Sequence, residues 1–200
     1  MNNLGGKIKI VESQVISLFQ RTEFPALLYH NLFHTFEVVF HAEELVYYYN
    51  LDEEDKFAVI VASWFHDTGH LLAVLKGHEE VGWKIAEEYL LPLGIESNIL
   101  AKIRSCIMST KMPVQPIQLI EQIICDADTY HLGTHLFVVT DKLVRKEFEM
   151  RANIDTRNWN NHTLRFLISH QFYTSYCRER LNAHKDMNIA LIERRIAEGI

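Results

Sequence analysis

The chain has 200 residues, close to the usual size of one domain, and its hydrophobic fraction of 48% is ordinary for a soluble globular protein. The formal net charge of −6 argues against a general nucleic-acid binder, because that function needs a basic face. No stretch is long and apolar enough to span a bilayer, and Met1 to Lys9 lack the pattern of a signal peptide. Three widely spaced cysteines without a CxxC pair are typical of a reduced intracellular protein, so we expect a cytoplasmic location.

Apolar residues recur with helical spacing along the whole chain. The first predicted helices cover residues 8–19 and 32–49, and Phe24-Pro25 separates them. Asp52 is a good N-cap for the most apolar run, Phe57 to Phe65, which we interpret as a buried helix ending at Gly69. Further helices are predicted over residues 79–90, 95–108, 117–125 (with Pro116 in its first turn), 133–148, 164–176 and 176–197, and 151–161 is polar and irregular. Without period-two alternation, repeats or a composition shift, the sequence predicts a single all-α domain of about eight to ten helices.

Histidine and aspartate lie side by side where the most apolar run meets polar chain, at His66-Asp67. An imidazole and a carboxylate are costly to bury unless something neutralises or coordinates them. This position therefore favours a metal site over a chance dipeptide.

Two other segments carry side chains of the same kind. His30 and His34 are four residues apart and would share one face of a helix, although a solvated pair is the simpler interpretation of these two alone. Asp126 and Asp128 end a predicted helix, where the helix dipole disfavours acids, so a shared cation is the favoured interpretation. A site of imidazoles and carboxylates suits a divalent Mn, Mg, Fe, Co, Ni or Zn ion, and its identity stays open.

The order of these segments resembles the HD-domain superfamily of metal-dependent phosphohydrolases, over roughly residues 29–133. The family pattern is a histidine, a His-Asp pair and a distant aspartate that follows a small residue. The resemblance implies the metal ligands His34, His66, Asp67 and Asp128, the last preferred to Asp126 because it follows Ala127. It also implies one HD-type domain over residues 1–200, with the metal-site core at 29–133 and C-terminal helices over 134–200.

The segment Tyr29-His30-Asn31-x-x-His34 is similar to the one that opens the metal site of cyclic-nucleotide phosphodiesterases. That similarity implies that His30 is the general acid, Asp67 orients the attacking water, and His70 lies near the phosphate or a second metal. Gly77-His78-Glu79 looks more like the small bacterial stand-alone HD proteins, where a histidine near His78 binds a second metal. No histidine occurs between Ser109 and Pro113, so we expect one tightly held metal and a weaker second one.

The resemblance implies hydrolysis of a nucleotide or related phosphoester by a metal-bound hydroxide, with Lys111 or a C-terminal arginine such as Arg178 holding a phosphate. The expected partner is thus a small phosphorylated substrate, with neither a nucleic-acid duplex nor a membrane. One alternative is an HD-type di-iron oxygenase, and another is a non-catalytic nucleotide- or metal-binding sensor. Aromatic residues over 151–185 could form a partner or homodimer surface, although plain helix packing is the simpler interpretation.

Overall fold

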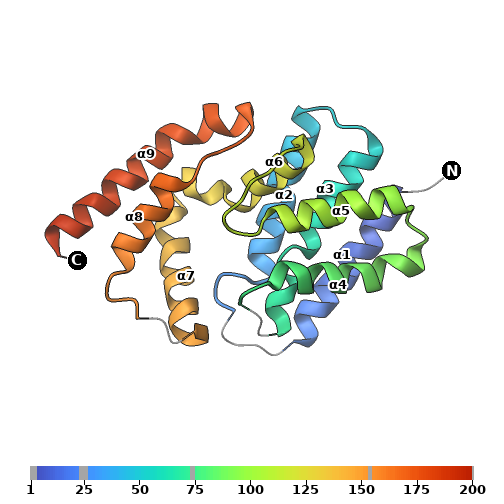
Figure 1. The fold of residues 1–200 in the computed structure, drawn as a ribbon, viewed down its shortest axis with the longest axis horizontal. Coiled ribbons are helices and arrows are strands. Elements are labelled where there is room, and N and C mark those ends of the chain that lie inside the picture. Colours follow the sequence, from blue (N-terminus) through green and yellow to red (C-terminus); the bar gives the residue numbers. More distant parts are fainter. Residues whose placement is uncertain (1–3, 23–26, 73–74, 153–154, 200) are drawn as a thin grey trace.

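The computed structural model describes residues 4–22, 27–72, 75–152 and 155–199, and in these ranges it is built from helices without strands. The all-α prediction is therefore confirmed (Figure 1). In chain order the elements are α1 (Leu4–Arg21), α2 (Leu32–Tyr48), α3 (Glu53–Phe65), the 3₁₀ helix η1 (Thr68–Leu72), α4 (His78–Leu90), η2 (Leu91–Leu93), α5 (Ser97–Ser109), α6 (Leu119–Asp128), η3 (Tyr130–Gly133), α7 (Phe137–Ala152), α8 (Trp159–Ser169) and α9 (Ser175–Glu198).

Helix α3 is the central helix of the fold. Every residue from Phe57 to Phe65 is buried, which is expected of a helix that is apolar all round. Its start is fixed by Asp52, whose side chain accepts a hydrogen bond from the backbone of Asp55. The acidic residues Glu53 to Asp55 in its first turn match the positive end of the helix dipole.

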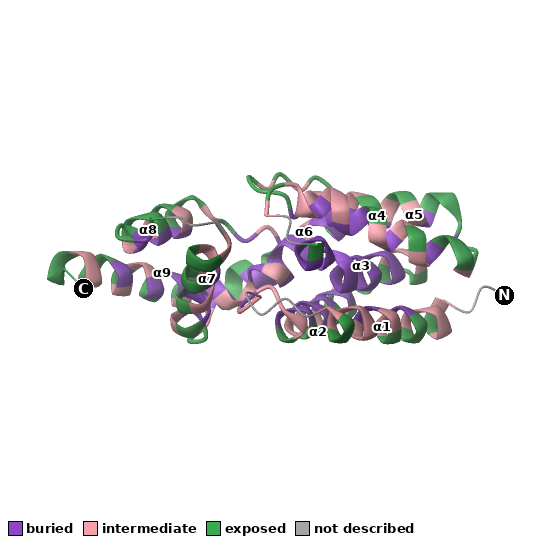
Figure 2. Ribbon diagram, turned by 90° about the horizontal axis from the view of Figure 1, so that it is seen from below, coloured by how far each residue is buried: buried purple, intermediate pink, exposed green. Residues whose placement is uncertain are grey.

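The other helices of the N-terminal part surround α3. Figure 2 shows α3 and α6 between a layer made of α1 and α2 and a layer made of α4 and α5. Helix α3 packs against α1, α2, α5 and α6. Helices α7, α8 and α9 lie at the opposite end of the long axis from α1 and α5 (Figure 1). The carboxyl ends of α3 and α6 are thereby brought close to the start of α2.

Buried hydrogen bonds join the C-terminal helices to the rest of the fold. The side-chain amide of Asn188, in α9, donates to the carbonyl oxygens of Leu132 at 2.9 Å and Thr134 at 3.0 Å. The chain between α8 and α9 is attached to α6, because backbone N–H groups of Tyr173 and Thr174 both donate to Asp126 at 2.8 Å. Buried polar groups of this kind need partners, so these contacts fix where α9 lies.

Several predicted boundaries are wrong in instructive ways. The buried helix ends at Phe65 rather than at Gly69, because the chain tightens into η1 after the His66 cap. Pro116 does not occupy the first turn of α6. That helix begins at Leu119, where Gln118 and Glu121 form a capping box.

The bounds predicted for the C-terminal helices also differ from the observed ones. Helix α7 begins at Phe137 instead of residue 133, and the supposedly irregular segment 151–161 contains the end of α7 and the start of α8. Helix α8 ends at Ser169, so residues 170–174 form an extended connection rather than a helix. The break predicted at Phe24-Pro25 lies outside the described residues.

Most of the large aromatic side chains over 151–185 are core residues. Trp159, Phe172 and Tyr176 are buried, so helix packing accounts for them. The homodimer surface expected there stays a prediction. Within the described part of the chain, none of the helices has the length and apolar character needed to cross a membrane.

Candidate metal centre

Three helix ends meet at one point and each contributes a candidate ligand. His34 lies in the first turn of α2, His66 caps α3 with Asp67 directly after it, and Asp128 is the last residue of α6. The start of α2 is fixed by Asn31, whose side chain accepts from the backbone of Phe33 and His34. Helix capping thus decides the direction in which these side chains point.

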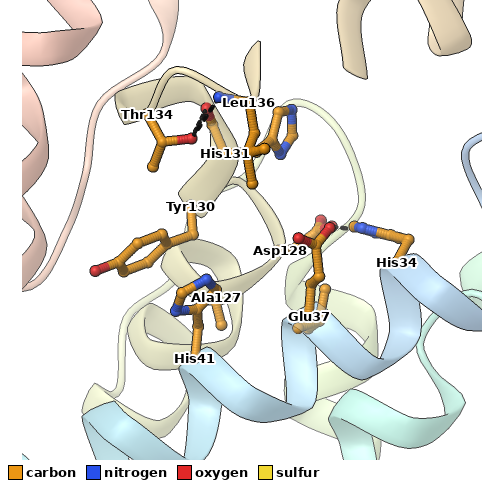
Figure 3. A pocket seen from close by; sticks show the side chains of 10 residues that line it. His34, Glu37, His41, Ala127, Asp128, Tyr130, His131, Thr134 and Leu136 are labelled. Carbon is orange, nitrogen blue, oxygen red and sulfur yellow. Dashed lines mark hydrogen bonds and ion pairs between the residues drawn. The ribbon is translucent and has the colours of Figure 1, made fainter. Parts of the chain in front are cut away.

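The side-chain atoms converge closely. His34 Nε2 lies 3.1 Å from Asp128 Oδ1 and 3.4 Å from Asp67 Oδ2. His66 Nε2 lies 3.2 Å from Asp67 Oδ2 and 3.7 Å from Asp128 Oδ1. One ligand atom each from His34, His66 and Asp128 lies within 4.8 Å of the others, so these residues could hold a metal ion. Figure 3 shows His34 and Asp128 facing one another.

Buried atoms without partners are found at this point. His66 Nε2 and Asp67 Oδ2 are buried, and neither has a hydrogen-bond partner with acceptable geometry. The other ring nitrogen of His66, Nδ1, donates to the Ser63 carbonyl at 2.9 Å, which leaves the lone pair of Nε2 aimed at the carboxylates. A buried lone pair opposite a buried carboxylate oxygen is costly unless a cation lies between them. The donor set therefore fits a divalent metal.

The electrostatics of the centre agree with that fit. Burial would lower the pKa of His34, but Asp128 and Asp67 outweigh it and raise the pKa to about 9. Burial would raise the pKa of the Asp67 and Asp128 carboxyls, but the neighbouring histidines hold both pKa values below the usual range. In the absence of a metal ion, protons on the two imidazoles thus balance the charge of the two carboxylates. A bound metal ion would displace these protons and supply the positive charge instead.

Two aspartates separated by one residue have different surroundings. Asp126 is fully buried and accepts three hydrogen bonds, from the backbone of Tyr173 and from the backbone and hydroxyl of Thr174. Asp128 faces the two histidines and keeps 21% of its side chain exposed. The structure therefore places Asp128, and not Asp126, among the candidate ligands.

A second cluster lies on the other side of Asp67. Ligand atoms of His30, Asp67 and His70 lie within 4.8 Å of one another. The ring of His78 stacks on that of His70 at 3.8 Å, and His78 Nε2 is 3.6 Å from Asp67 Oδ1. Glu79, also buried, has Oε1 3.5 Å from His78 Nε2 and an unpartnered Oε2. Asp67 is thus the residue that both clusters share.

Helix α7 brings a carboxylate and a guanidinium group to this second cluster. Glu147 is fully buried and binds His30 Nδ1 at 2.7 Å, while its other oxygen accepts from the backbone of Tyr29 at 2.7 Å and of His30 at 3.1 Å. Arg151, one turn later, donates from Nη1 to Glu147 at 2.6 Å. Burial would raise the pKa of Glu147, but His30, the Tyr29 backbone and Arg151 lower it to about 2. Glu147 is therefore an ionised acceptor that holds the proton of His30 on Nδ1.

The hydrogen bonds around His70 assign its tautomer. Arg151 Nη1 lies 3.1 Å from His70 Nδ1, and a guanidinium can only donate. Burial, His30, His78 and Arg151 together lower the pKa of His70 to about 2, so the ring is neutral. A neutral ring that accepts at Nδ1 carries its proton on Nε2. The protonated Nε2 of His70 is buried, lies 3.9 Å from Asp67 Oδ1, beyond hydrogen-bond distance, and has no hydrogen-bond partner among the described residues. In this tautomer Nε2 is an available donor rather than a metal ligand.

A small hollow borders the first cluster on the side where Asp128 is exposed. Its walls, shown in Figure 3, include Glu37 and His41 of α2 and Tyr130, His131 and Thr134 from the chain after α6. His41 stacks flat on Tyr130 at 3.6 Å between ring centroids. His131 Nδ1 and the Tyr29 hydroxyl form a hydrogen bond of 3.0 Å, and burial lowers the pKa of His131 to about 3. The hollow is thus a polar recess that leads to His34 and Asp128.

The family model of the HD domain matches residues 31–133, slightly more than half of the chain, and includes His34, His66, Asp67 and Asp128. This chain belongs to the HD domain family. The HD domain covers α2 to η3, so α1 precedes it and α7 to α9 follow it.

A solved structure has the same fold. It is the crystal structure of a predicted HD superfamily hydrolase from an uncultured Thermotogales bacterium, and its TM-score to this chain is 0.60 at 22% sequence identity. The similarity covers 95% of this chain and 91% of that one, so it extends beyond the HD domain match to the flanking helices. No curated protein matches this HD domain chain.

The site lacks some expected residues and includes others that the sequence did not indicate. Lys111 is exposed in the turn after α5, and Arg178 lines a different cavity, so neither is placed at the metal centre. His30 precedes α2 and does not share a helical face with His34, although their ring centroids are 6.1 Å apart. Glu147 and Arg151 lie outside the HD domain match, and their i,i+4 spacing is ordinary for a solvated helix pair.

Proposed function

We propose that this HD domain protein is a metal-dependent hydrolase of a small phosphoester, a nucleotide or a related compound. The observation that supports it most directly is the pair of buried, unpartnered atoms His66 Nε2 and Asp67 Oδ2 at the meeting point of three helix ends. The similar fold of a protein described as a predicted hydrolase agrees with this proposal. Fold similarity at this level does not determine the reaction, so the proposal depends on the site.

Four residues would hold the metal: His34, His66, Asp67 and Asp128. A bound divalent ion supplies activation of water at neutral pH and withdraws negative charge from phosphoryl oxygens. Imidazole and carboxylate ligands without thiolates suit Mn, Mg, Fe, Co, Ni or Zn. Four protein ligands leave two positions for water and substrate on an ion that takes six ligands, which a closed four-coordinate site does not.

His30 would protonate the leaving oxygen. Glu147 fixes the proton of Nδ1, so Nε2 is the nitrogen that faces the reaction and can carry a second proton. A general acid in this position contributes about 10²–10⁴-fold to the rate.

His70 would donate a hydrogen bond from Nε2 to a phosphoryl oxygen or to the attacking water. Arg151 holds His70 in the tautomer that this role requires and adds positive charge behind it. His78 and Glu79 lie next to this donor, where a second, weaker metal ion could be held together with Asp67.

The decisive experiment loads the full-length chain with each candidate metal and measures turnover of chromogenic mono- and diesters and of mono-, di- and cyclic nucleotides. His30→Gln should retain metal but lose about 10²–10⁴-fold in kcat. Asp67→Asn should lose both metal and activity. Glu53→Gln, an exposed acid on α3 whose side chain is 80% exposed, is the matched control and should behave like the unmodified chain.

Two outcomes would contradict the proposal. If the chain binds metal tightly but hydrolyses no phosphoester, the protein is a binding or sensor module instead. If it contains two irons and its turnover consumes O₂, the oxygenase alternative holds.

A further inference from the structure

A second cavity lies in the C-terminal part of the chain, between the connection that follows α8 and the first turns of α9. It has a volume of about 430 Å³. Its polar lining residues include His170, Tyr173, Arg178, Asn182, Lys185 and Asp186. None of its lining residues belongs to either histidine cluster or to the HD domain match over 31–133. The cavity therefore has no part in the proposed hydrolysis.

Lys185 is a buried cation on the wall of this cavity. Only 6% of the residue is exposed, and its ammonium group donates to the His170 carbonyl and lies 3.3 Å from His170 Nδ1. Among the described residues, no carboxylate lies within 4.0 Å of the Lys185 ammonium. A buried ammonium without an ion-pair partner is costly, and burial lowers the pKa of Lys185 although the charge of Asp186 acts to raise it.

The neighbouring histidine leaves this charge uncompensated. The Thr129 hydroxyl donates to the Cys125 carbonyl at 2.7 Å, so it accepts from His170 Nε2 at 3.0 Å. His170 is therefore protonated on Nε2 and presents its Nδ1 lone pair to Lys185. Burial, with Lys185 next to it, lowers the pKa of His170 to about 3, so the ring itself is neutral. An ammonium has three N–H groups, and His170 uses two of those on Lys185.

Arg178 is the second cation of the cavity. Its side chain is exposed, and Nη1 donates to the Tyr173 carbonyl. In the part of the chain that the structure describes, Arg178 also has no carboxylate within ion-pair distance. Asp186 is the acid in the lining, and it forms no ion pair with Arg178 or Lys185. The lining thus carries one more positive than negative charge.

We propose that this cavity binds the phosphate group of a small anionic molecule, held by Lys185 and Arg178 with the Asn182 amide as a further donor. A guanidinium binds phosphate oxygens in pairs, and an ammonium supplies a point charge to the remaining oxygens. The cavity is larger than a phosphate ion, so an organic group can occupy the rest. The ligand would supply the counter-ion that Lys185 lacks.

The test measures binding by calorimetry to the full-length chain treated with a chelator, with inorganic phosphate, a nucleoside monophosphate and succinate as separate probes. Phosphate should bind once per chain. Arg178→Gln and Lys185→Met should each weaken that binding about tenfold or more, as expected for the loss of a charged hydrogen bond. Arg194→Gln, an exposed cation on the same helix α9 that does not line the cavity, is the control and should bind as before.

A further variant separates this site from the metal centre. Asp67→Asn should retain phosphate binding even though it lacks hydrolytic activity. Tighter binding of the nucleoside monophosphate than of phosphate would support an organic phosphate as the ligand. The proposal is wrong if phosphate does not bind at millimolar concentration, if Arg178→Gln leaves binding unchanged, if Asp67→Asn abolishes it, or if succinate binds more tightly.

Discussion

Single residues in this protein differ in role according to the partners that reach them. Asp126 and Asp128 lie two positions apart on α6, and yet one is saturated with hydrogen bonds and the other faces two histidines. His30 and His70 belong to the same cluster. Glu147 accepts from Nδ1 of the first, whereas Arg151 donates to Nδ1 of the second, so the two rings carry their protons on different nitrogens.

The two aspartates should therefore respond differently to the same substitution. Asp126→Asn replaces one of the two accepting oxygens by an NH2 group, so the donors of Tyr173 and Thr174 cannot all be satisfied, and we expect it to lower the free energy of unfolding by about 2–3 kcal/mol. Metal affinity should change little. Asp128→Asn should weaken metal binding about a hundredfold because a charged ligand is lost. Denaturant unfolding of the metal-free chain and competition titration with a chromogenic chelator measure the two effects, and a reversed pattern would show the ligand assignment to be wrong.

Glu147 should make stability depend on pH in acid. Its pKa falls from 4.5 to about 2 in the folded protein, so protonation favours the unfolded chain. Its contribution, roughly 1 to 3 kcal/mol, is fully present above pH 4.5 and is lost as the pH falls toward 2. Unfolding of the unmodified chain and of Glu147→Gln should thus differ at neutral pH and converge over that interval. A constant difference would exclude this ionisation as the cause.

At the scale of elements, the site is made where helices end. The cap of α3, the last residue of α6 and the first turn of α2 contribute candidate metal ligands, and η1 carries His70 back toward them. The approach of η1 to α4 is very close, because a Cβ on Gly69 would lie 2.0 Å from the His78 carbonyl oxygen. Gly69 is therefore required by the contact that places His70 against His78.

Two glycine substitutions test this contact. Gly69→Ala should lower the free energy of unfolding by about 3 kcal/mol or more, since the clash is with backbone and cannot be relieved by a rotamer change. Gly77→Ala should cost only about 1–2 kcal/mol, because Gly77 has a φ of +80° but open space around it. Thermal unfolding of both variants shows which one loses more stability. An equal or smaller loss in Gly69→Ala would contradict the close packing of η1 on α4.

At the scale of the whole molecule, the site links the HD domain to the helices that follow it. Glu147 in α7 binds His30 across 117 positions of sequence. Asp126 in α6 anchors the connection between α8 and α9. The C-terminal helices thus complete the second cluster and do not merely cover the core.

Because the metal would bind only to the assembled helix ends, it should stabilise the entire fold. At a free concentration of about 100 times Kd, the added stability is about 2.7 kcal/mol, which raises Tm by roughly 5 to 10 °C for a chain of this size. Asp67→Asn should abolish this shift, whereas Glu53→Gln should retain it. Differential scanning calorimetry with and without metal measures the effect. A shift that persists in Asp67→Asn would place the metal elsewhere.

The sequence by itself determined the fold class and most of the first cluster. Helical periodicity is a local property, so the nearly uninterrupted apolar run from Phe57 to Phe65 and the capping residue Asp52 predicted the start of α3 and its burial, although not its end. The side-chain chemistry of His34, His66, Asp67 and Asp128 is likewise readable without coordinates, and the structure brings these four together.

Only the tertiary structure decided which distant side chains complete the sites. Periodicity shows which face of a helix is buried but not what that face meets, so Glu147 and Arg151 resembled a solvated pair until α7 was placed against His30 and His70. Lys185 likewise resembled an ordinary cation of α9, and its burial next to His170 follows from how α9 packs. The charge environment of a residue depends on contacts far apart in sequence, and those contacts are fixed by the packing of the whole chain.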